Sequence, residues 1–356
     1  MGIESEIRQK ICREYNTHRN KENGMQGLIG LGAGILSCAS AVGKKEREGP
    51  LGECFDLSDD QDRFGQKTWE KAESEMQKRS FACAMEKAGM KTDGVDILMA
   101  GDLLNQCVGS AYGLLSYDIP YIGLYGACST AAEGLLLGAA MIGHGICKTA
   151  GVVTSSHYCA AERQYRLPVE YGGQRPPTAQ WTVTGSGAYL LGAPAAKGAV
   201  LTRGMAGIVV EKGIKDANNM GAAMAPAAAS TLLRFFGESG ETPENYDLIV
   251  TGDLGYEGSA ILRDLTATEG LILPEHLCND CGMMIYARTL DDTHAGGSGC
   301  GCSAVVLASY LIPKVVSGQI RRMLFVGTGA MMSPDSVKQG QTIPAVAHLV
   351  EIVHGK

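Results

Sequence analysis

The sequence predicts an α/β protein built from two duplicated halves, and three observations lead to that prediction. Residues 89–103 align without gaps with residues 240–254, at a constant offset of 151 residues. Cys128-Ser129 matches Cys302-Ser303 at an offset of 174, so the second half carries 23 additional residues between the two matches. In both halves, hydrophobic patterns typical of helices alternate with patterns typical of strands.

Each half is expected to contain the same succession of elements. In each repeat a helix ends at a glycine, a polar turn and a strand follow, and Gly-Asp-Leu stands at the carboxyl end of the strand. The predicted helices cover residues 68–89 and 222–237, and the predicted strands cover residues 96–100, 120–125, 149–154, 182–191, 247–251, 322–328 and 345–353. We expect one mixed sheet in each half, with functional groups at the carboxyl ends of its strands.

The chain divides into three parts on composition. Residues 1–24 are polar and charged and are interpreted as an N-terminal arm. A stretch of small residues, 194–203, marks the boundary between a first half, residues 25–198, and a second half, residues 199–356.

Composition excludes several classes of protein. Of the 356 residues 45% are apolar, which allows a substantial core, and the net charge of −7 without a basic run argues against a nucleic-acid partner. Twelve cysteines in a chain that opens without an apolar leader predict free thiols in a reducing compartment. Because no charge-free apolar stretch is long enough to span a membrane, we expect a soluble protein.

Cys128 lies where a short apolar strand turns into a helix rich in alanine, glycine and leucine. The Gly-Ala pair before it permits a tight turn, and Ser129 or Thr130 is expected to cap the helix. Free N–H groups and the helix dipole at this position favour a thiolate. The geometry suits either acyl transfer or the capture of an anion.

Further polar residues are candidates for the same site. A long polar loop, residues 155–180, carries four basic side chains that can face a cleft: His157, Arg163, Arg166 and Arg175. Asp102 and Asp253 occupy equal places in the two repeats, which favours a structural role for both. Asn105 occurs in the first repeat alone, and a pocket role and a structural role are about equally favoured for it.

Four cysteines have a spacing that zinc sites also use, namely Cys278, Cys281, Cys300 and Cys302. Cys302, however, aligns with Cys128 in the internal repeat and lies at the start of an apolar helix. The sequence therefore predicts no metal site.

Seven strings give the chain a resemblance to a known family: KKEREGPLG, AGDLLNQ, LYGACST, SSHYCAAERQYRLPVEYG, AQWTVTG, HAGGSGCGCSA and IPAVAHLV. They span nearly the whole chain and resemble the stage V sporulation protein AD family, which has a thiolase-like fold. The resemblance implies a five-layer αβαβα body and a homodimer. It also implies that the protein binds dipicolinic acid (pyridine-2,6-dicarboxylate) and works with the membrane proteins of a spore channel complex. That complex moves the compound during sporulation and germination, which implies a peripheral location at the spore inner membrane.

Condensing enzymes of this fold use a histidine and an asparagine beside the cysteine to stabilise an oxyanion. At the corresponding places this chain has Asp253, within Thr-Gly-Asp-Leu-Gly, and the string Gly-Cys-Gly-Cys-Ser at residues 299–303. A negatively charged Asp253 would repel an oxyanion. The sequence therefore favours a catalytically inactive pocket that binds a ligand, with no cofactor.

Three hypotheses remain open. In the first, the pocket binds dipicolinic acid through Cys128, Ser129, Asn105, His157, Arg163, His294 and Ser298. In the second, the protein is an acyltransferase acting on acyl-CoA or acyl-carrier protein, with Cys128 as nucleophile and His294 as its partner. In the third, the pocket has filled in and the protein is a structural subunit.

Overall fold

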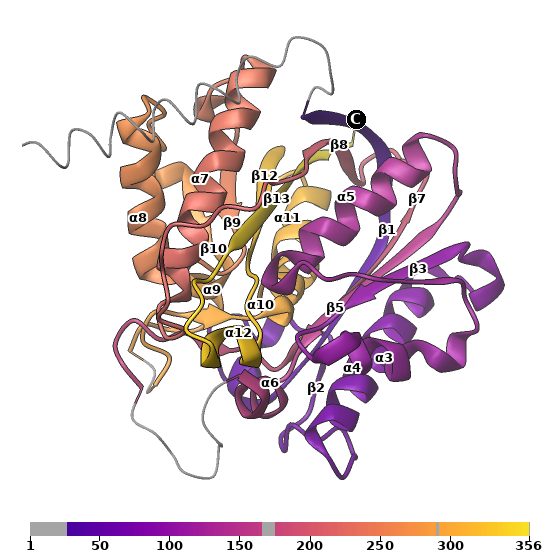
Figure 1. The fold of residues 1–356 in the computed structure, drawn as a ribbon. Helices are drawn as coiled ribbons and strands as arrows, with labels where there is room; N and C mark the ends of the chain where they lie inside the picture. The colour runs from indigo at the N-terminus through magenta and orange to yellow at the C-terminus, as the bar shows by residue number, and fades with distance from the viewer. Residues whose placement is uncertain (1–26, 166–174, 290–291, 356) are drawn as a thin grey trace, which may run out of the picture.

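The computed structural model describes residues 27–165, 175–289 and 292–355. These residues form an 11-stranded mixed sheet with helices on its faces (Figure 1). The order of its main path is β10-β9-β12-β13-β8-β1-β7-β5-β3-β4, and β2 pairs with β1 outside that path. The predicted N-terminal arm, residues 1–24, lies outside the described residues.

The first half contains seven strands and five helices among the described residues. The strands are β1 (Leu28–Val42), β2 (Leu57–Ser58), β3 (Ile97–Gly101), β4 (Tyr121–Gly123), β5 (Ala150–Ser156), β6 (Trp181–Thr182) and β7 (Gly185–Gly192). The helices are α2 (Lys44–Arg47), α3 (Trp69–Ala88), α4 (Val108–Leu114), α5 (Thr130–Gly143) and α6 (Tyr158–Tyr165).

The second half repeats this pattern with additional short elements. Its strands are β8 (Ala199–Met205), β9 (Leu248–Thr251), β10 (Cys278–Asp280), β11 (Gly297–Ser298), β12 (Arg322–Ala330) and β13 (Ala345–His354). Its helices are α7 (Met220–Ser239), α8 (Gly255–Thr268), α9 (Cys281–Ile285), α10 (Cys300–Val306), α11 (Ile312–Val316) and α12 (Pro334–Lys338). A π-helical turn, Leu307–Leu311, connects α10 to α11.

The internal repeat is visible in the structure. Helices α3 and α7 are each 20 residues long, and each ends at a left-handed glycine, Gly89 with a φ of 62° and Gly240 with a φ of 68°. Only glycine adopts this conformation without a steric penalty, so the aligned glycines end the two helices for the same reason. A short 3-10 turn and then β3 or β9 follow in the two halves.

The expectation of two separate sheets needs one correction. Strands β1 and β8 pair antiparallel along their edges, and this pairing joins the two five-stranded sets into one sheet. The predicted boundary stretch, residues 194–203, covers most of the connection between β7 and β8 and the first residues of β8. Neither long strand that forms the junction was predicted.

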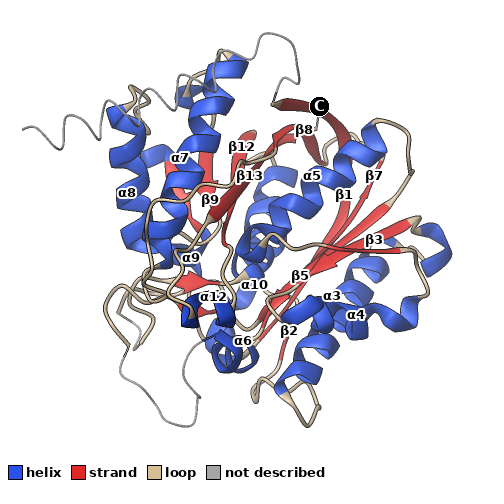
Figure 2. Ribbon diagram, viewed as in Figure 1, coloured by secondary structure: helices blue, strands red, loops and turns tan. Residues whose placement is uncertain are grey.

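The helices form three layers around the strands, as Figure 2 shows. Helix α5 lies at the centre, because it packs against β1 and β5 of the first half and against β12 and β13 of the second. Its partner α10 packs against β5 and β7. Helix α3 covers the outer face of the first half, and α7 with α8 covers that of the second. This is the five-layer αβαβα arrangement that the family resemblance implied.

In the described part of the chain, no helix combines the length and apolar character that crossing a membrane would require.

Candidate functional site

The Cys128 turn follows edge strand β4 and leads into the central helix α5. Ala127 is left-handed, with a φ of 50°, and begins one turn of 3-10 helix. The hydroxyl groups of Ser129 and Thr130 donate hydrogen bonds to the carbonyl oxygens of Gly126 and Ala127, each at 2.6 Å. The predicted side-chain cap is therefore wrong, since these hydroxyls bond back into the turn and no side chain caps α5. A left-handed alanine costs about 1–3 kcal/mol, so surrounding contacts must hold the turn.

Strand β12 of the second half supplies one of those contacts. A Cβ atom at Gly329 would lie 2.2 Å from the carbonyl oxygen of Gly126 and 3.0 Å from the backbone nitrogen of Ser129. Glycine is required at this position because only a residue without a side chain lets the strand approach the turn so closely. The cysteine turn of the first half is thus held in place by the second half.

A buried carboxyl group faces the thiol of Cys128. Asp253, which follows β9, is fully buried and accepts hydrogen bonds from Thr328 Oγ1 at 2.8 Å, Ser298 Oγ at 2.9 Å and the Gly299 N–H at 3.0 Å. The Cys128 thiol donates a further hydrogen bond to it. Side chains from both halves therefore meet at one carboxylate beneath the cysteine.

Burial and this carboxyl group keep Cys128 in the thiol form. Burial raises the pKa of Cys128 well above its ordinary value, and the charge of Asp253 raises it further. Burial also raises the pKa of Asp253 to about 6, an effect that the nearby Asp280 increases and the hydrogen bonds to Asp253 oppose. The prediction that the helix dipole favours a thiolate is wrong here, because loss of solvation outweighs the dipole.

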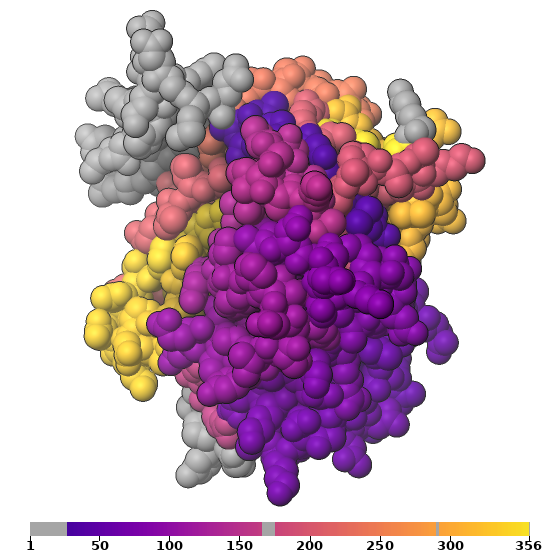
Figure 3. Space-filling model, turned by 90° about the vertical axis from the view of Figure 1, so that its right-hand side faces the viewer, coloured from indigo at the N-terminus to yellow at the C-terminus, as the bar shows by residue number. Residues whose placement is uncertain are grey.

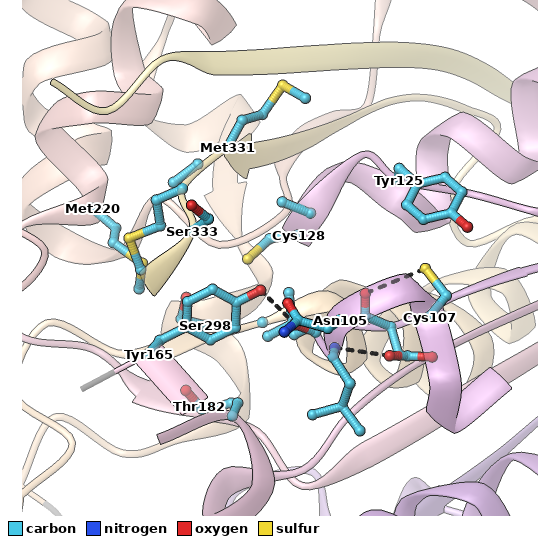
Figure 4. A pocket seen from close by; sticks show the side chains of 18 of the residues that line it. Asn105, Cys107, Tyr125, Cys128, Tyr165, Thr182, Met220, Ser298, Met331 and Ser333 are labelled. Carbon is cyan, nitrogen blue, oxygen red and sulfur yellow. Dashed lines mark hydrogen bonds between the residues drawn. The ribbon is translucent and has the colours of Figure 1, made fainter. Parts of the chain in front are cut away.

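A cavity of about 420 Å³ opens beside Cys128. Figure 4 shows the sulfur pointing into this space, with Tyr165 on one side and Met331 and Ser333 on the other. Its wall comes from the loop after β3, the cysteine turn, α6, the start of α7, β11 and the loop after β12. The volume lies within the roughly 300–1,000 Å³ typical of small-molecule sites, so the structure does not support the hypothesis of a filled pocket.

The cavity wall carries no positive charge among the residues that the structure describes. Asp102 and Glu162 are its two charged residues, and none of the described lining residues is lysine, arginine or histidine. Glu162 accepts a hydrogen bond from Thr182 Oγ1 at 3.0 Å and lies 3.6 Å from the guanidinium of Arg175. A ligand in this cavity therefore meets neutral hydrogen-bonding groups and acidic side chains.

Three of the seven predicted ligand residues lie in the wall. These are Cys128, Asn105 and Ser298. The backbone N–H of Asn105 donates to Gln164 Oε1 at 3.2 Å, which fixes the loop after β3 against α6. Whether these side chains contact a ligand remains a prediction.

The structure does not bring His157 into the wall of the cavity. Its side chain is fully buried, its Nε2 lies 2.7 Å from the carbonyl oxygen of Asp62, and its ring packs 5.3 Å from that of Trp69. Burial lowers the pKa of His157, so the ring is held neutral. The cation expected at this position is therefore not available to an anionic ligand.

Two other basic candidates, Arg163 and His294, also have partners away from the cavity wall, whereas Arg175 lies beside Glu162 of the wall. Arg163 pairs with Glu70 at the surface, and His294 Nε2 lies 3.2 Å from Asp292 Oδ1. Arg166 lies outside the described residues. The side chain of Ser129 is committed to the turn, as described above. The acyltransferase hypothesis pairs Cys128 with His294, but the described contacts place His294 beside Asp292 and the Cys128 thiol beside Asp253.

Sequence reasoning missed several residues that line the cavity. Tyr165, Glu162, Thr182, Met220 and Met331 all contribute to its wall. The hydroxyl of Tyr165 donates to the carbonyl oxygen of Leu103 at 2.6 Å, which closes α6 over the loop after β3. Tyr165 and Glu162 stand inside one of the seven strings quoted for the family resemblance. The two methionines gave no such signal.

The four cysteines with zinc-like spacing make other contacts. Cys300 donates to the carbonyl oxygen of Ala127 at 2.9 Å, and Cys302 donates to that of Gly252 at 3.8 Å. Within the described ranges, no group of three or more histidine, cysteine, aspartate or glutamate side chains is arranged to hold a metal ion.

Solved structures with similar architecture identify the fold. A tetronic acid condensing enzyme, AbyA1, matches 90% of this chain and 99% of its own with a TM-score of 0.56 at 17% identity. A variant of OleA from Xanthomonas campestris matches 90% and 98% with a TM-score of 0.57 at 13% identity. 3-Oxoacyl-[acyl-carrier-protein] synthase III from Aquifex aeolicus VF5 matches 91% and 100% with a TM-score of 0.53 at 12% identity. The protein therefore has the thiolase-like fold that these enzymes share.

Sequence comparison then defines the family. The family model of stage V sporulation protein AD matches residues 30–353. The stage V sporulation protein AD of Bacillus subtilis (strain 168) is 42% identical over 315 residues, which cover 88% of this chain and 92% of that relative. The chain belongs to the stage V sporulation protein AD family.

Proposed function

We propose that this protein binds dipicolinic acid in the cavity beside Cys128 and does not catalyse a reaction there. The single observation that carries the proposal is the carboxyl group of Asp253 facing the thiol, in a family of sporulation proteins. A condensing enzyme needs a thiolate nucleophile and donors for an oxyanion. A buried acid in hydrogen-bond contact with the thiol opposes both.

The cavity provides groups suited to a small, flat, polar ligand. Asn105 and Ser298 offer neutral hydrogen bonds from opposite sides, and Tyr165 offers an aromatic face. Met220 and Met331 add polarisable apolar surface for a ring. The pattern of a few polar groups on a mostly apolar wall is typical of small-molecule sites.

The proposal extends to partners. The protein would act with the membrane proteins of a spore channel complex in uptake of dipicolinic acid during sporulation and its release during germination. Attachment at the spore inner membrane would then be peripheral and would depend on those proteins.

We also propose that the protein is a homodimer. Strand β4 is an open edge of the sheet, and it exposes Tyr121 and Ile122 beside the exposed Tyr112, Leu115 and Tyr125. Figure 3 views the side of the molecule on which α3, α4 and β3 lie in Figure 1, and residues of the first half form most of it. An open edge with apolar side chains favours pairing with a second copy. Analytical ultracentrifugation of the wild type and of Ile122→Lys tests this, with a dimer and a monomer as the expected results.

Calorimetric titration with dipicolinate tests the binding function. Asn105→Ala and Ser298→Ala are expected to weaken binding at least tenfold, because each loses a hydrogen bond to a charged group. Lys71→Ala, an exposed position on α3, is the matched control and should bind as the wild type does. Isophthalate, which lacks the ring nitrogen, and picolinate, which lacks one carboxylate, report which ligand groups matter.

The same samples test the alternative of acyl transfer. After incubation with acyl-CoA, mass spectrometry of the peptide containing Cys128 should show no acyl adduct. An adduct that forms, and turnover that Cys128→Ala abolishes, would show an acyltransferase and overturn the proposal.

A further inference from the structure

An anionic ligand in this cavity faces an electrostatic problem. Asp102 and Glu162 line the wall, Asp253 lies directly behind Cys128 and Ser298, and the described lining residues include no cation. Arg175 lies near the carboxylate of Glu162. Carboxylates of the ligand placed beside Asp253 would repel its charge strongly, since Asp253 is fully buried.

Ser298 connects Asp253 to the cavity. Ser298 lines the cavity, and its Oγ donates to Asp253 Oδ2 at 2.9 Å. While Asp253 is ionised, the hydroxyl proton of Ser298 points at Asp253, and Ser298 can offer the cavity only oxygen lone pairs. In that state Ser298 accepts hydrogen bonds from a ligand but cannot donate one to a carboxylate.

The other groups around Asp253 do not neutralise it. The titratable side chains that influence it are Asp280 from β10 and the thiols of Cys128, Cys281 and Cys302 from the cysteine turn, α9 and α10. Its remaining hydrogen bonds come from Thr328 and the Gly299 N–H, which are neutral. In the described part of the chain, no lysine, arginine or histidine side chain donates a hydrogen bond to Asp253.

We propose that a dicarboxylate enters this cavity together with one proton, that Asp253 takes up this proton, and that Ser298 then donates its hydroxyl proton to the ligand. The inference rests on the proposed function and specifies the form in which the site accepts its ligand. Asp253 and Ser298 are thereby the residues that select for an anion, although only Ser298 lies in the cavity wall.

The proton balance is simple. The proton comes from solvent and forms an O–H bond on Asp253 Oδ2. This new O–H donates to Ser298 Oγ, and the Ser298 hydroxyl rotates and donates to a carboxylate of the ligand. The contact between Asp253 and Ser298 is kept with its direction reversed, so no buried polar group loses its partner.

The ordinary working pH range makes this exchange measurable. Because burial raises the pKa of Asp253 to about 6, the free protein carries an ionised Asp253 at pH 8 and a mostly protonated one at pH 5. Binding should therefore take up close to one proton at pH 8 and almost none at pH 5. Affinity should fall by up to about tenfold for each pH unit above pH 6. The ligand stays a dianion through most of this range, since carboxyl groups titrate near pH 4.

A second pair of buried acids is the competing explanation. Asp102 accepts a hydrogen bond from Ser110 Oγ at 2.6 Å, Gln77 Nε2 donates to both Ser110 and Ser155, and Ser155 donates to Glu73 at 2.8 Å. Burial raises the pKa of Glu73 and of Asp102. This network reaches the cavity through Asp102, so the test must separate it from Asp253.

The test is calorimetric titration of the full chain with dipicolinate at pH 8 in buffers of different ionisation enthalpy. The slope of observed enthalpy against buffer enthalpy gives the number of protons taken up. A slope near one is expected for the wild type and for Glu73→Gln, and a slope near zero for Asp253→Asn. Asp253→Asn should also bind more tightly than the wild type at pH 8, by tenfold or more. If a variant fails to fold, a wild-type titration repeated at pH 5 still tests the proton uptake itself, which should be almost absent there.

The outcomes are distinct. Binding without proton uptake in the wild type overturns this inference and leaves the proposed function intact. Uptake that persists in Asp253→Asn and disappears in Glu73→Gln overturns the assignment to Asp253. If no binding heat appears between pH 5 and pH 8, the proposed function is wrong and the inference is overturned with it. Binding that does not weaken in Ser298→Ala overturns the role given to the Ser298 hydroxyl.

Discussion

The two halves place an aspartate at the same position of the repeat and use it differently. Asp102 follows β3 and bonds within its own loop, accepting from the backbone N–H groups of Leu104 and Ser110 at 2.8 and 2.7 Å. Asp253 follows β9 and accepts instead from Ser298 and Thr328, which belong to other elements. Equal positions in a duplicated sequence therefore do not imply equal roles.

A third aspartate accounts for the difference. In the second half, Asp280 accepts from the backbone N–H groups of Leu254 and Gly255 at 2.8 and 3.0 Å. Gly255 aligns with Leu104, whose N–H donates to Asp102 in the first half. Asp253 is thereby free to reach across to Cys128. Strand β10 pairs with β9 as β4 pairs with β3, so the counterpart of Asp280 in the first repeat is Gly123, which has no side chain to accept these bonds.

Removing the Asp280 side chain should abolish this difference between the halves, and of all the proposed variants it should have the largest effect on stability. Asp280→Ala removes the carboxylate that accepts from the N–H groups of Leu254, Gly255 and Met283 and from Thr251 Oγ1, which keeps a long hydrogen bond to the carbonyl oxygen of Asn279. We expect the free energy of unfolding to fall by about 4 kcal/mol, because unsatisfied buried donors are costly. Urea denaturation measures it. Asp93→Ala, an exposed position, should change it by less than about 0.5 kcal/mol. Equal losses in the two variants would contradict the assignment.

The half-buried imidazole of His348 gives the next largest effect on stability, and its pH dependence is opposite in sign to that of Asp253. Burial lowers the pKa of His348 on β13 to about 4. The unfolded chain binds this proton near pH 6.5, so the stability that His348 contributes is complete above that pH and is lost as the pH falls to 4. Asp253, with its raised pKa, instead gains stability as the pH falls from 6 toward 4.

The contribution of His348 is isolated by subtraction. The stability of His348→Gln relative to the wild type should rise by about 3 kcal/mol between pH 7 and pH 4. Denaturant unfolding at several pH values measures it. The exposed His144→Gln should show no such trend, and a flat difference for His348→Gln would mean that the imidazole is solvated.

The alkylation rate of the Cys128 thiol reports directly on how each of the two aspartates, Asp253 and Asp102, affects the thiol. Asp253→Asn removes the charge beside the thiol, so its pKa should fall and its alkylation by iodoacetamide at pH 8 should rise about fivefold. Asp102→Asn should leave the rate unchanged, because Asp102 makes no hydrogen bond to the thiol. Mass spectrometry of the peptide containing Cys128 gives both rates. A similar increase in both variants would show that the halves act on the thiol alike.

The smallest effect is expected for the surface arginine that the sequence placed in the pocket. Arg163 pairs with Glu70, and both side chains are well exposed. Arg163→Ala should change the free energy of unfolding by less than about 0.5 kcal/mol and the affinity for dipicolinate by less than twofold. A tenfold loss of affinity would instead show that Arg163 contributes to ligand binding, as is proposed for Asn105 of the same half.

The sequence predicted the fold well because its signals are local and repeated. The aligned glycines at 89 and 240 each end a helix. The Gly-Asp-Leu strings mark the end of one strand in each half, β3 and β9. The join between β1 and β8 was not predictable in this way, since the pairing of edge strands depends on residues far apart in the chain.

The candidate site was predicted only in part, for a physical reason that His157 illustrates. A histidine in a polar string indicates a ligand contact, yet its partner is the backbone of Asp62, which no local pattern connects to it. Met220 and Met331 show the reverse case. They look like ordinary core residues in the sequence, and only the packing of α7 and β12 brings them to the same cavity.

By itself the sequence determined the duplicated α/β architecture and the cysteine turn. Periodicity, helix ends and tight turns depend on neighbouring residues, so they can be read along the chain. The tertiary structure alone decided that Asp253 meets the Cys128 thiol, that the basic candidates His157 and Arg163 lie elsewhere, and that the cavity wall is acidic. Burial and charge partners set these properties, and both arise only when distant segments pack together.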